Sequence, residues 1–565
     1  MEKSKITKSL AVFASVLLII IIGVASFAYF GTFNVNLNNN VAVNINSSSP
    51  GNATFTSTAT QLNLQVPAAN MSFTVANNTV AAKEDTAFLD VTLTGSSNLL
   101  TTCTYDIVYA YDAGSNVYGQ GTTTKTSGAT KEITIEVNGM NGNNHFATET
   151  NFNFDTSKGW SNATSSKGAK VTLVTGATLK SLGTEQSVRW KVIGRYYNLD
   201  LNQYALSGKS FTGKIYVENV NCSTEDGTTV KKGYETILAN NGGTASMTTL
   251  TSTDFATVTT ENDKGMYKAP DDLGTSYYFR GAVDNNWVKY GKYTKDMYNC
   301  NNGTISATDT GNSCTKIASS GDDIYWRIIR INGDNSIRMI YSGVTAPTES
   351  TKVIKTTDTS LGNSQFNAKY DSAEYVGYMY TIGEQHGTSQ SSGIKTYLDN
   401  WYANYTDLNK TGTKITDQIF CNDRIVSKLD PPNTYYGAQG RLYSNKTPIL
   451  TCPTASDKFT VNTSNGNGAL TYPVGLITAD EVAMAGGVYN SGNSSYYLYT
   501  NQYYWAGSPI LFYVGYGAGG FRVGDGGFLY GGFVYNSSEV RGVVSLSSES
   551  KLLGSGTYND VYVVS

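Results

Sequence analysis

Residues 504–546 read YWAGSPILFYVGYGAGGFRVGDGGFLYGGFVYNSSEVRGVVSL, and this segment restricts the fold more than any other part of the chain. Between positions 510 and 540 it contains nine Gly, four Tyr and four Phe, and no Lys, Pro, Thr, Met or Trp. Glycine is unfavourable inside helices, and so many aromatic residues are not typical of a flexible linker. The composition therefore predicts short strands and turns. Tyr and Gly also dominate binding loops, so the segment is either a candidate contact surface or part of an ordinary Gly- and Tyr-rich β domain.

The flanks of this segment resemble a known family. WAGSP at residues 505–509, VRGVVSL at residues 540–546 and the apolar residues between them are similar to the C-terminal region of bacterial C-type-lectin-fold domains. These domains are related to the formylglycine-generating enzyme and include the variable proteins of diversity-generating retroelements.

In that family, adenine-directed mutagenesis of AAC-like codons excludes Lys, Glu, Gln, Met and Trp from diversified sites. The resemblance implies a variable, ligand-binding region at about residues 510–540. The candidate variable sites, none of which carries an excluded residue, are Ile510, Leu511, Tyr513, Val514, Gly515, Tyr516, Gly524, Asp525, Gly526, Phe528, Tyr530, Gly531, Gly532, Phe533, Tyr535, Asn536 and Ser538.

The aromatic residues of the segment divide into two expected groups. Phe512, Phe521, Val523, Leu529 and Val534 supply an apolar core set for short strands, so the remaining rings exceed what a monomer needs to bury. We expect those rings on one exposed face, where clustered aromatic side chains usually mark an interaction site; packing against the helices is the alternative. The expected patch consists of Tyr513, Tyr516, Phe528, Tyr530, Phe533 and Tyr535.

Length and composition indicate a multidomain β-rich protein. The chain has 565 residues, a formal net charge of -3 and 15% charged residues. This length predicts two or three domains, and the charge gives no indication of a nucleic-acid partner. The 41 Tyr against 20 Phe favour strands with one solvated face. We therefore expect an extracellular protein that does not bind nucleic acid.

The N-terminus has the features of an export signal. Three lysines among the first eight residues precede an uncharged run over residues 9–30, which at ~1.5 Å per residue is long enough to cross a ~30 Å hydrocarbon core. We expect residues 1–33 to form an uncleaved transmembrane helix with a cytoplasmic N-terminus, so that the protein contacts the membrane there and is displayed on the cell surface. Cleavage after Ala28 and secretion is the alternative.

Six cysteines in an exported chain predict disulfides. Six cysteines permit fifteen pairings, but two pairs bracket local loops and leave the two most N-terminal cysteines for each other. No CxxC motif is present and the two histidines are far apart in the sequence, so we expect no metal site. The predicted disulfides are Cys103 with Cys222, Cys300 with Cys314, and Cys421 with Cys452.

Residues 34–222 are expected to form a β-sandwich stalk domain. Apolar and polar residues alternate with a period of two at, among others, residues 62–66, 87–93 and 215–220, as in half-buried strands. The start of this region, AYFGTFNVNL from Ala28, resembles camelysin-like surface and matrix-fibre proteins of Gram-positive bacteria. Residues 248–260 are Thr- and Ser-rich, and we expect residues 223–270 to form a linker with a short helix at residues 233–240.

Residues 271–565 are expected to form the second folded domain. Two strands flank a tight turn at residues 332–335, and residues 391–405 have the spacing of an amphipathic helix. A second helix begins after Thr478, because Glu481 completes a capping box. This order resembles the formylglycine-generating-like C-type lectin fold. The expected class is α+β and β-rich overall: an N-terminal transmembrane helix, a β-sandwich and a C-type-lectin-like domain with two helices and irregular strands.

Three functions are compatible with these features. The first is a cell-surface ligand-binding protein, receptor- or adhesin-like, whose diversified surface contacts a protein or glycan ligand on a host, a phage or another microbe. The second is a structural surface or matrix protein. The third, an enzyme of the formylglycine-generating class, would need free thiols where disulfides are expected. The first is favoured, so we expect a protein without enzymatic activity and without a cofactor.

Overall fold

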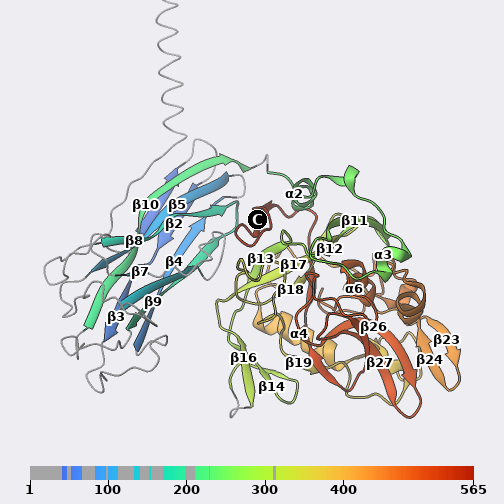
Figure 1. The fold of residues 1–565 in the computed structure, drawn as a ribbon. Coiled ribbons are helices and arrows are strands. Elements are labelled where there is room, and N and C mark those ends of the chain that lie inside the picture. The colour runs from blue at the N-terminus through green and yellow to red at the C-terminus, as the bar shows by residue number, and fades with distance from the viewer. Residues whose placement is uncertain are drawn as a thin grey trace, which may run out of the picture. The chain divides into compact units, whose positions relative to one another are not determined.

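The computed structural model describes residues 41–46, 52–65, 83–96, 99–111, 133–139, 152–153, 170–196, 210–227, 230–309 and 313–565. These residues belong to two compact units, one within residues 1–230 and the other over residues 231–564 (Figure 1). The segment expected to cross a membrane, residues 1–33, lies outside the described residues.

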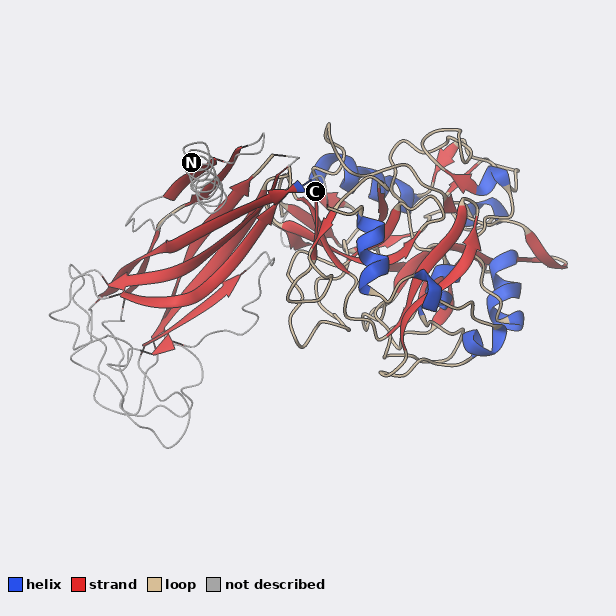
Figure 2. Cartoon of the chain, turned by 90° about the horizontal axis from the view of Figure 1, so that it is seen from above, coloured by secondary structure: helices blue, strands red, loops and turns tan. Residues whose placement is uncertain are grey.

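The α+β class expected from the sequence is wrong. Strands dominate the described residues (Figure 2), and only three of their helices exceed six residues: α2 (Gly233–Asn240), α4 (Gly393–Tyr405) and α6 (Ala479–Ala485). None of the helices in the described ranges is long and apolar enough to span a bilayer. The shorter helical turns are η4 (Thr244–Ser246), α3 (Ser252–Ala256), η5 (Ala373–Val376), α5 (Gly437–Gln439), η6 (Gly440–Asn445) and η7 (Ala455–Asp457).

Two antiparallel sheets form the first unit. One contains, in spatial order, β1 (Val41–Asn46), β2 (Asn52–Ser57), β4 (Lys83–Thr94), β9 (Gln186–Tyr196), β6 (Ile133–Gly139) and β7 (Phe152–Asn153). The other contains β3 (Thr60–Gln65), β10 (Ser210–Asp226), β5 (Leu99–Tyr111) and β8 (Lys170–Ser181).

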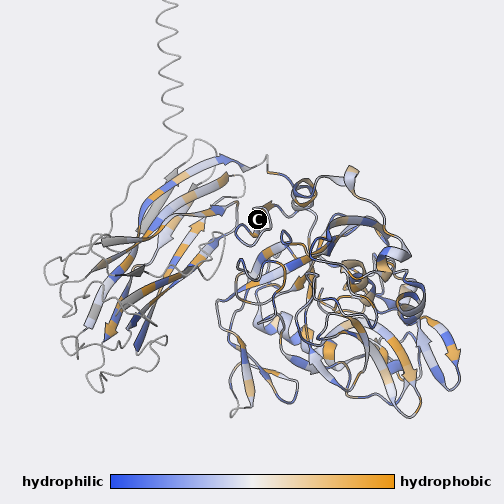
Figure 3. Ribbon diagram, in the orientation of Figure 1, coloured by the Kyte–Doolittle hydropathy of each residue, from blue (hydrophilic) through white to orange (hydrophobic). Residues whose placement is uncertain are grey.

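The two sheets of the first unit share one core. Hydrophilic and hydrophobic residues alternate along their strands (Figure 3), so each strand turns one face inward. Leu89 and Trp190 from one sheet and Tyr105 from the other lie in a single buried cluster, where the Trp190 indole donates to the Tyr105 hydroxyl at 3.0 Å. Sheets that bury their inner faces against each other form a β-sandwich.

All three predicted disulfides are confirmed: Cys103–Cys222, Cys300–Cys314 and Cys421–Cys452. The first joins cysteines that are directly opposite each other on β5 and β10. Structural disulfides form and persist in oxidising compartments, so the chain matures in an oxidising, extracellular-type environment.

The segment expected to be a linker is part of the second unit. Helix α2 has the predicted bounds, but Ile237 within it is fully buried in the core of that unit, as is Met247 beyond it. Phe255 of α3 packs against Tyr278 and Met484 in a smaller buried cluster. Although the segment is polar on average, these three apolar side chains pack it against the second unit.

A mixed sheet forms the first half of the second unit. Its strands are, in spatial order, β11 (Lys264–Asp271), β12 (Gly274–Gly281), β17 (Asp323–Ile331), β13 (Trp287–Lys292), β32 (Tyr562–Val564) and β31 (Leu552–Leu553), with β18 (Ile337–Tyr341) and β30 (Val543–Leu546) attached through β17. The predicted hairpin is β17–β18, and Trp326 and Met339 on it are fully buried. Trp401 of α4 packs against Trp326 and Tyr341.

A second sheet carries the glycine-rich segment. Its main path is β19 (Asn363–Gln365), β29 (Ser537–Glu539), β26 (Tyr504–Tyr513), β24 (Asn433–Tyr436) and β23 (Val426–Asp430), and β27 (Gly517–Val523) pairs with both β26 and β28 (Leu529–Phe533). Helix α6 begins with the predicted capping box between Thr478 and Glu481. Small sheets comprise β14 (Met297–Cys300) with β15 (Ile305–Ser306) and β16 (Cys314–Ala318), β20 (Met379–Tyr380) with β21 (Gln390–Ser391), and β22 (Phe420–Cys421) with β25 (Lys458–Phe459).

Alkaline pH is expected to unfold the second unit, because several of its tyrosines are buried as neutral phenols. Desolvation raises the pKa of Tyr341, Tyr378 and Tyr496 well above 10.0. The stabilisation that these neutral phenols contribute is fully present below pH 10. Above pH 10 the tyrosines of the unfolded chain lose their protons, while those of the folded chain keep them. The free energy of unfolding therefore falls by about 1.4 kcal/mol per pH unit for each tyrosine. Chemical denaturation at a series of pH values measures this slope, and a stability that stays constant up to about pH 12 would contradict it.

Candidate ligand-binding surface

The glycine-rich segment folds as three adjacent antiparallel strands, β26, β27 and β28. The register of β27 and β28 is regular, with Gly519 opposite Phe533, Arg522 opposite Tyr530 and Val523 opposite Leu529. The predicted core residues Phe521, Val523, Leu529 and Val534 are fully buried, whereas Phe512 is only half-buried.

Trp505 and Arg541 are buried frame residues at the two ends of the segment. The Trp505 indole is fully buried, donates to the Ser364 carbonyl at 2.9 Å and meets the Phe366 ring edge to face at 5.6 Å. The Arg541 guanidinium donates to the Tyr341 carbonyl from two nitrogens, at 3.0 and 3.1 Å. Neither side chain is available to a ligand.

Six aromatic rings form a continuous series at one end of this sheet, which we call the aromatic ladder. Its centroid separations are 4.7 Å for Tyr370–Tyr535, 5.7 Å for Tyr535–Phe533, 6.4 Å for Phe533–Tyr516, 6.5 Å for Tyr516–Tyr513 and 5.9 Å for Tyr513–Tyr435. The rings come from the ends of β24, β26 and β28 and from the loops beside them.

The ladder is partly exposed along its length. Tyr516 is 68% exposed and Tyr370 45% exposed, while the other four rings are half-buried. Val514 and Leu429, on the neighbouring β26–β27 turn and on β23, are also exposed, so the surface around the ladder is apolar. An exposed apolar patch of this kind usually marks a site of contact.

Sequence reasoning found four ladder rings and missed Tyr370 and Tyr435. Both belong to the surface through long-range contacts: Tyr435 pairs with Leu511 across β24 and β26, and Gly517 lies against Tyr370. The Tyr435 and Tyr513 hydroxyls share a 2.6 Å hydrogen bond, which together with desolvation raises the pKa of Tyr435 to about 12. No local motif marks either tyrosine.

The expectation that six aromatic residues share one face is wrong. Successive side chains on a strand point to opposite faces, so Tyr530 and Phe533, three positions apart on the regular strand β28, lie on opposite sides of the sheet. Tyr530 instead meets Phe528 edge to face at 5.9 Å. The aromatic residues therefore form two groups, the ladder and the Phe528–Tyr530 pair.

The candidate variable sites differ in exposure. Those with exposed side chains or backbone are Val514, Gly515, Tyr516, Asp525 and Tyr530, and those that are half-buried are Leu511, Tyr513, Gly526, Phe528, Gly531, Phe533, Tyr535 and Asn536. Ile510, Gly524, Gly532 and Ser538 are buried. Ile510 is inside because its side chain covers Gly519 and Gly531, and Ser538 because its hydroxyl accepts a hydrogen bond from Arg522 at 3.1 Å.

The glycines among the candidate sites are surrounded differently from those of the frame. A Cβ atom at Gly524, Gly531 or Gly532 would approach only the side chains of Phe528, Ile510 or Arg522, respectively, and one at Gly515 would meet nothing within 4 Å. Side chains can move to make room.

Two frame glycines, Gly517 and Gly527, lack this freedom. A Cβ at Gly527 would lie 1.8 Å from the backbone carbonyl oxygen of Asn493, and one at Gly517 would lie 2.8 Å from that of Tyr370. Both glycines also have positive φ, 77° and 120°, a conformation that residues with side chains rarely adopt. Gly517 and Gly527 therefore require glycine, whereas Gly524, Gly531 and Gly532 have side-chain neighbours that can move; Gly515 has open space but a φ of 87°.

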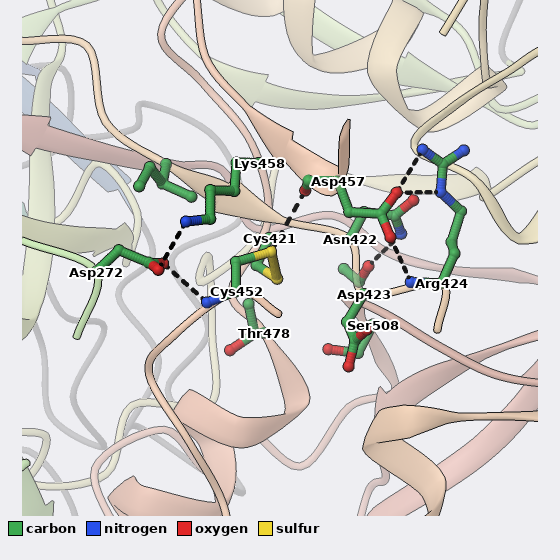
Figure 4. Close-up of a disulfide and its surroundings, with 12 residues drawn as sticks. Asp272, Cys421, Asn422, Asp423, Arg424, Cys452, Asp457, Lys458, Thr478 and Ser508 are labelled. Atoms are coloured by element: carbon green, nitrogen blue, oxygen red, sulfur yellow. Dashed lines mark hydrogen bonds and ion pairs between the residues drawn. A yellow bond between two sulfur atoms is a disulfide. The ribbon is translucent and has the colours of Figure 1, made fainter. Parts of the chain in front are cut away.

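The Cys421–Cys452 disulfide lies in a network of internal polar contacts (Figure 4). Asp272 accepts hydrogen bonds from the Lys458 ammonium at 2.9 Å and from the Cys452 backbone amide at 2.8 Å. The carboxylate is therefore engaged in holding the loop that the disulfide closes.

The cleft beside this disulfide is lined by ion pairs within the fold. The Arg330 guanidinium contacts Asp271 at 2.8 Å and Glu481 at 2.9 Å, and close by Arg424 and Asp457 form a fully buried pair. Burial by itself would raise the pKa of the Glu481 carboxyl, but Arg338 and Arg330 beside it hold that pKa below its usual value. These charges neutralise one another and fix the frame beneath the sheet.

Comparison of the chain with protein-family models, with curated proteins and with solved structures finds no match.

Proposed function

We propose that this chain is an exported ligand-binding protein, receptor- or adhesin-like, whose second unit presents a variable contact surface, and that this surface is diversified by a retroelement. The observation that carries the proposal is the aromatic ladder, in which six rings from separate segments collect at one end of a sheet and remain partly exposed. Tyrosine provides large amphipathic contact area at low entropic cost, as in antibody binding loops. The clustering of partly exposed tyrosine side chains in the ladder supports a role in ligand binding rather than in packing of the core.

The arrangement of the rings favours a protein ligand. Tyr516, Phe533 and Tyr535 are nearly parallel, with interplanar angles of 11° and 2°. Ring edges and phenol hydroxyls remain available here, and these suit interdigitation with the side chains of another protein.

The surroundings of the glycines support variability. A frame that tolerates different side chains must keep its backbone when they change. At Gly524, Gly531 and Gly532 the neighbours that limit space are side chains, and two of those neighbours, Phe528 and Ile510, are themselves candidate sites. Changes in this surface can therefore be accommodated within the surface.

A display library tests the proposal directly. Tyr513, Tyr516, Phe533 and Tyr535 are randomised in the full chain, and clones are selected against a model protein antigen such as lysozyme. A control library randomises the exposed residues 409–412 on a loop of the same unit. We expect antigen-specific, folded clones from the ladder library only. Equal yields from both libraries, or unfolded clones from the ladder library, would contradict a dedicated variable surface.

The ladder is expected to contribute little to stability. Changing Tyr516→Ser and Tyr535→Ser together should lower the free energy of unfolding by less than about 2 kcal/mol, because both rings are partly exposed and exchange only weak ring contacts. In any antigen-binding clone that retains these tyrosines, the same double change should abolish binding. Thermal denaturation and a binding titration measure the two effects, and loss of folding would place the rings in the core.

The diversification mechanism has its own test. A reverse transcriptase gene and a near-identical template repeat beside the 3′ end of the gene are expected, with substitutions confined to the candidate codons in populations grown from single cells. Substitutions spread equally over Trp505 and Arg541 would contradict directed diversification.

A further inference from the structure

Arg522 differs from the other arginines of the chain in how its guanidinium is held. All ten lie in the described residues, and each of the other nine has at least two hydrogen bonds or ion pairs. Arg522 has a single hydrogen bond, to the Ser538 hydroxyl, and its Nε is inaccessible to solvent without a partner. A partly buried guanidinium whose hydrogen-bond donors have no acceptors costs free energy, unless a ligand supplies the missing acceptors.

Aromatic rings orient this guanidinium. Its central carbon lies 5.2 Å from the centroid of the Tyr503 ring and 5.5 Å from that of the Trp505 ring. Tyr530, directly opposite Arg522 in the strand register, projects from the same face and is 42% exposed. The side chain is thus held by cation–π contacts and is not neutralised by an acid.

The nearest acidic groups have other partners. Burial raises the pKa of the Tyr503 phenol. Asp525, which is exposed and lies against the Tyr503 hydroxyl, raises this pKa further. Glu539 lies on β29, on the far side of β26 from Arg522; burial raises the pKa of its carboxyl, while Arg541 and a hydrogen bond with Ser360 act in the opposite direction. Desolvation also lowers the pKa of Arg522 itself. No carboxylate of the described residues forms an ion pair with Arg522.

We propose that Arg522, with Tyr503 and Tyr530 beside it, is a binding site for a carboxylate of an acidic side chain on a protein ligand. The planar guanidinium presents parallel donors that match a carboxylate, and Arg and Tyr are the residues most enriched at the energetic centres of protein interfaces. The site lies on the face of β28 opposite the ladder ring Phe533, so it is a second contact area. The inference rests on the proposed ligand-binding role of this unit.

Gly532 is the residue that makes room for the site. A Cβ atom there would lie 2.1 Å from the Nε of Arg522 and 2.4 Å from its central guanidinium carbon. Any other residue at position 532 must displace the guanidinium. Gly520, opposite Gly532 on the same face, offers a matched control, because a Cβ there would be 3.6 Å from Trp505, an ordinary contact.

The test uses the full chain and two peptides that differ only in charge, N-acetyl-Tyr-Glu-amide and N-acetyl-Tyr-Gln-amide. Phenylglyoxal modifies accessible arginines, and peptide mass spectrometry reports the rate at Arg522. Arg189, a half-exposed arginine paired with Asp90 in the first unit, serves as the internal reference. We expect the Glu peptide to protect Arg522 at about tenfold lower concentration than the Gln peptide, as for a charge-assisted contact, without effect on Arg189.

Two glycine variants test whether the peptide protects Arg522 by binding at this site. Gly532→Ala should remove the difference between the two peptides, whereas Gly520→Ala should keep it, with both proteins retaining the melting temperature of the unmodified chain within a few degrees. Equal protection by the two peptides, or none by either, would overturn the proposal. Protection by glucuronate but not by the Glu peptide would overturn it in favour of an acidic glycan.

These outcomes are separable from those of the display library. The library randomises ladder residues on the other face of β28 and does not alter Arg522. A library that yields no binders therefore leaves the peptide measurement intact, and a failed peptide measurement leaves the ladder as the contact surface.

Discussion

Replacing Trp505 with alanine is expected to lower the free energy of unfolding of the second unit by about 3 to 5 kcal/mol, the range for deletion of a buried indole. The side chain is fully buried and packs edge to face on Phe366. Its removal leaves a cavity beside Phe366 and leaves the Ser364 carbonyl without its donor. The loss should therefore lie toward the upper end of the range.

Chemical denaturation followed by circular dichroism measures this effect. Tyr516→Ala is the matched control, since it deletes a large aromatic side chain from the same three-stranded segment at a position that is 68% exposed. The control should change stability by less than about 1 kcal/mol. Equal losses in the two variants would mean that Trp505 is not part of the frame.

Removing the Cys103–Cys222 disulfide is expected to destabilise the first unit by about 4 to 5 kcal/mol. The two cysteines are 119 residues apart, and in the chain-entropy model a longer closed loop restricts the unfolded chain more strongly. The bond joins β5 and β10, the two central strands of their four-stranded sheet.

The comparison is with Cys300–Cys314, which closes a separation of only 14 residues and should contribute about 3 kcal/mol. Paired Cys→Ser variants of each disulfide, unfolded in denaturant, give the two values. A larger loss from the shorter loop would show that native-state packing rather than chain entropy sets the stability of these links.

Local signals in the sequence predicted individual elements well. The capping box at Thr478 and Glu481 marks the start of α6, and the turn at residues 332–335 marks the β17–β18 hairpin, because each depends on residues only a few positions apart. The disulfides were predictable for a similar reason. Two of the three pairs close short loops, and the third pair was then the only one left.

What the sequence could not supply was the register of the glycine-rich strands. Register is normally set by an alternating apolar pattern, and glycine interrupts that pattern at Gly519, Gly520, Gly531 and Gly532. The division of the aromatic residues between two faces therefore became apparent only in the structure. Tyr435 was equally inaccessible, since it reaches the ladder through the pairing of β24 with β26.

The linker expectation failed for a different reason. Residues 231–270 are polar on average, and average composition does not reveal a few apolar side chains at separated positions. Ile237, Met247 and Phe255 are enough to bury the segment against the second unit. Burying each of these side chains stabilises the packed state by about 1.5 to 3 kcal/mol. This is enough to hold a segment in place although its composition is typical of a linker.

The spacing between Gly524 and Phe528 has a consequence for how sequence variation accumulates. The phenyl ring fills the space that a side chain at position 524 would need, and the closest atoms are 2.6 Å from the site of its Cβ. Substitutions at the two positions should therefore be strongly epistatic, with a larger residue at 524 tolerated mainly when 528 becomes smaller. Ladder positions such as Tyr516 have no contact with this pair and should vary independently of it. Covariation among natural variants would then divide the surface into blocks that evolve separately.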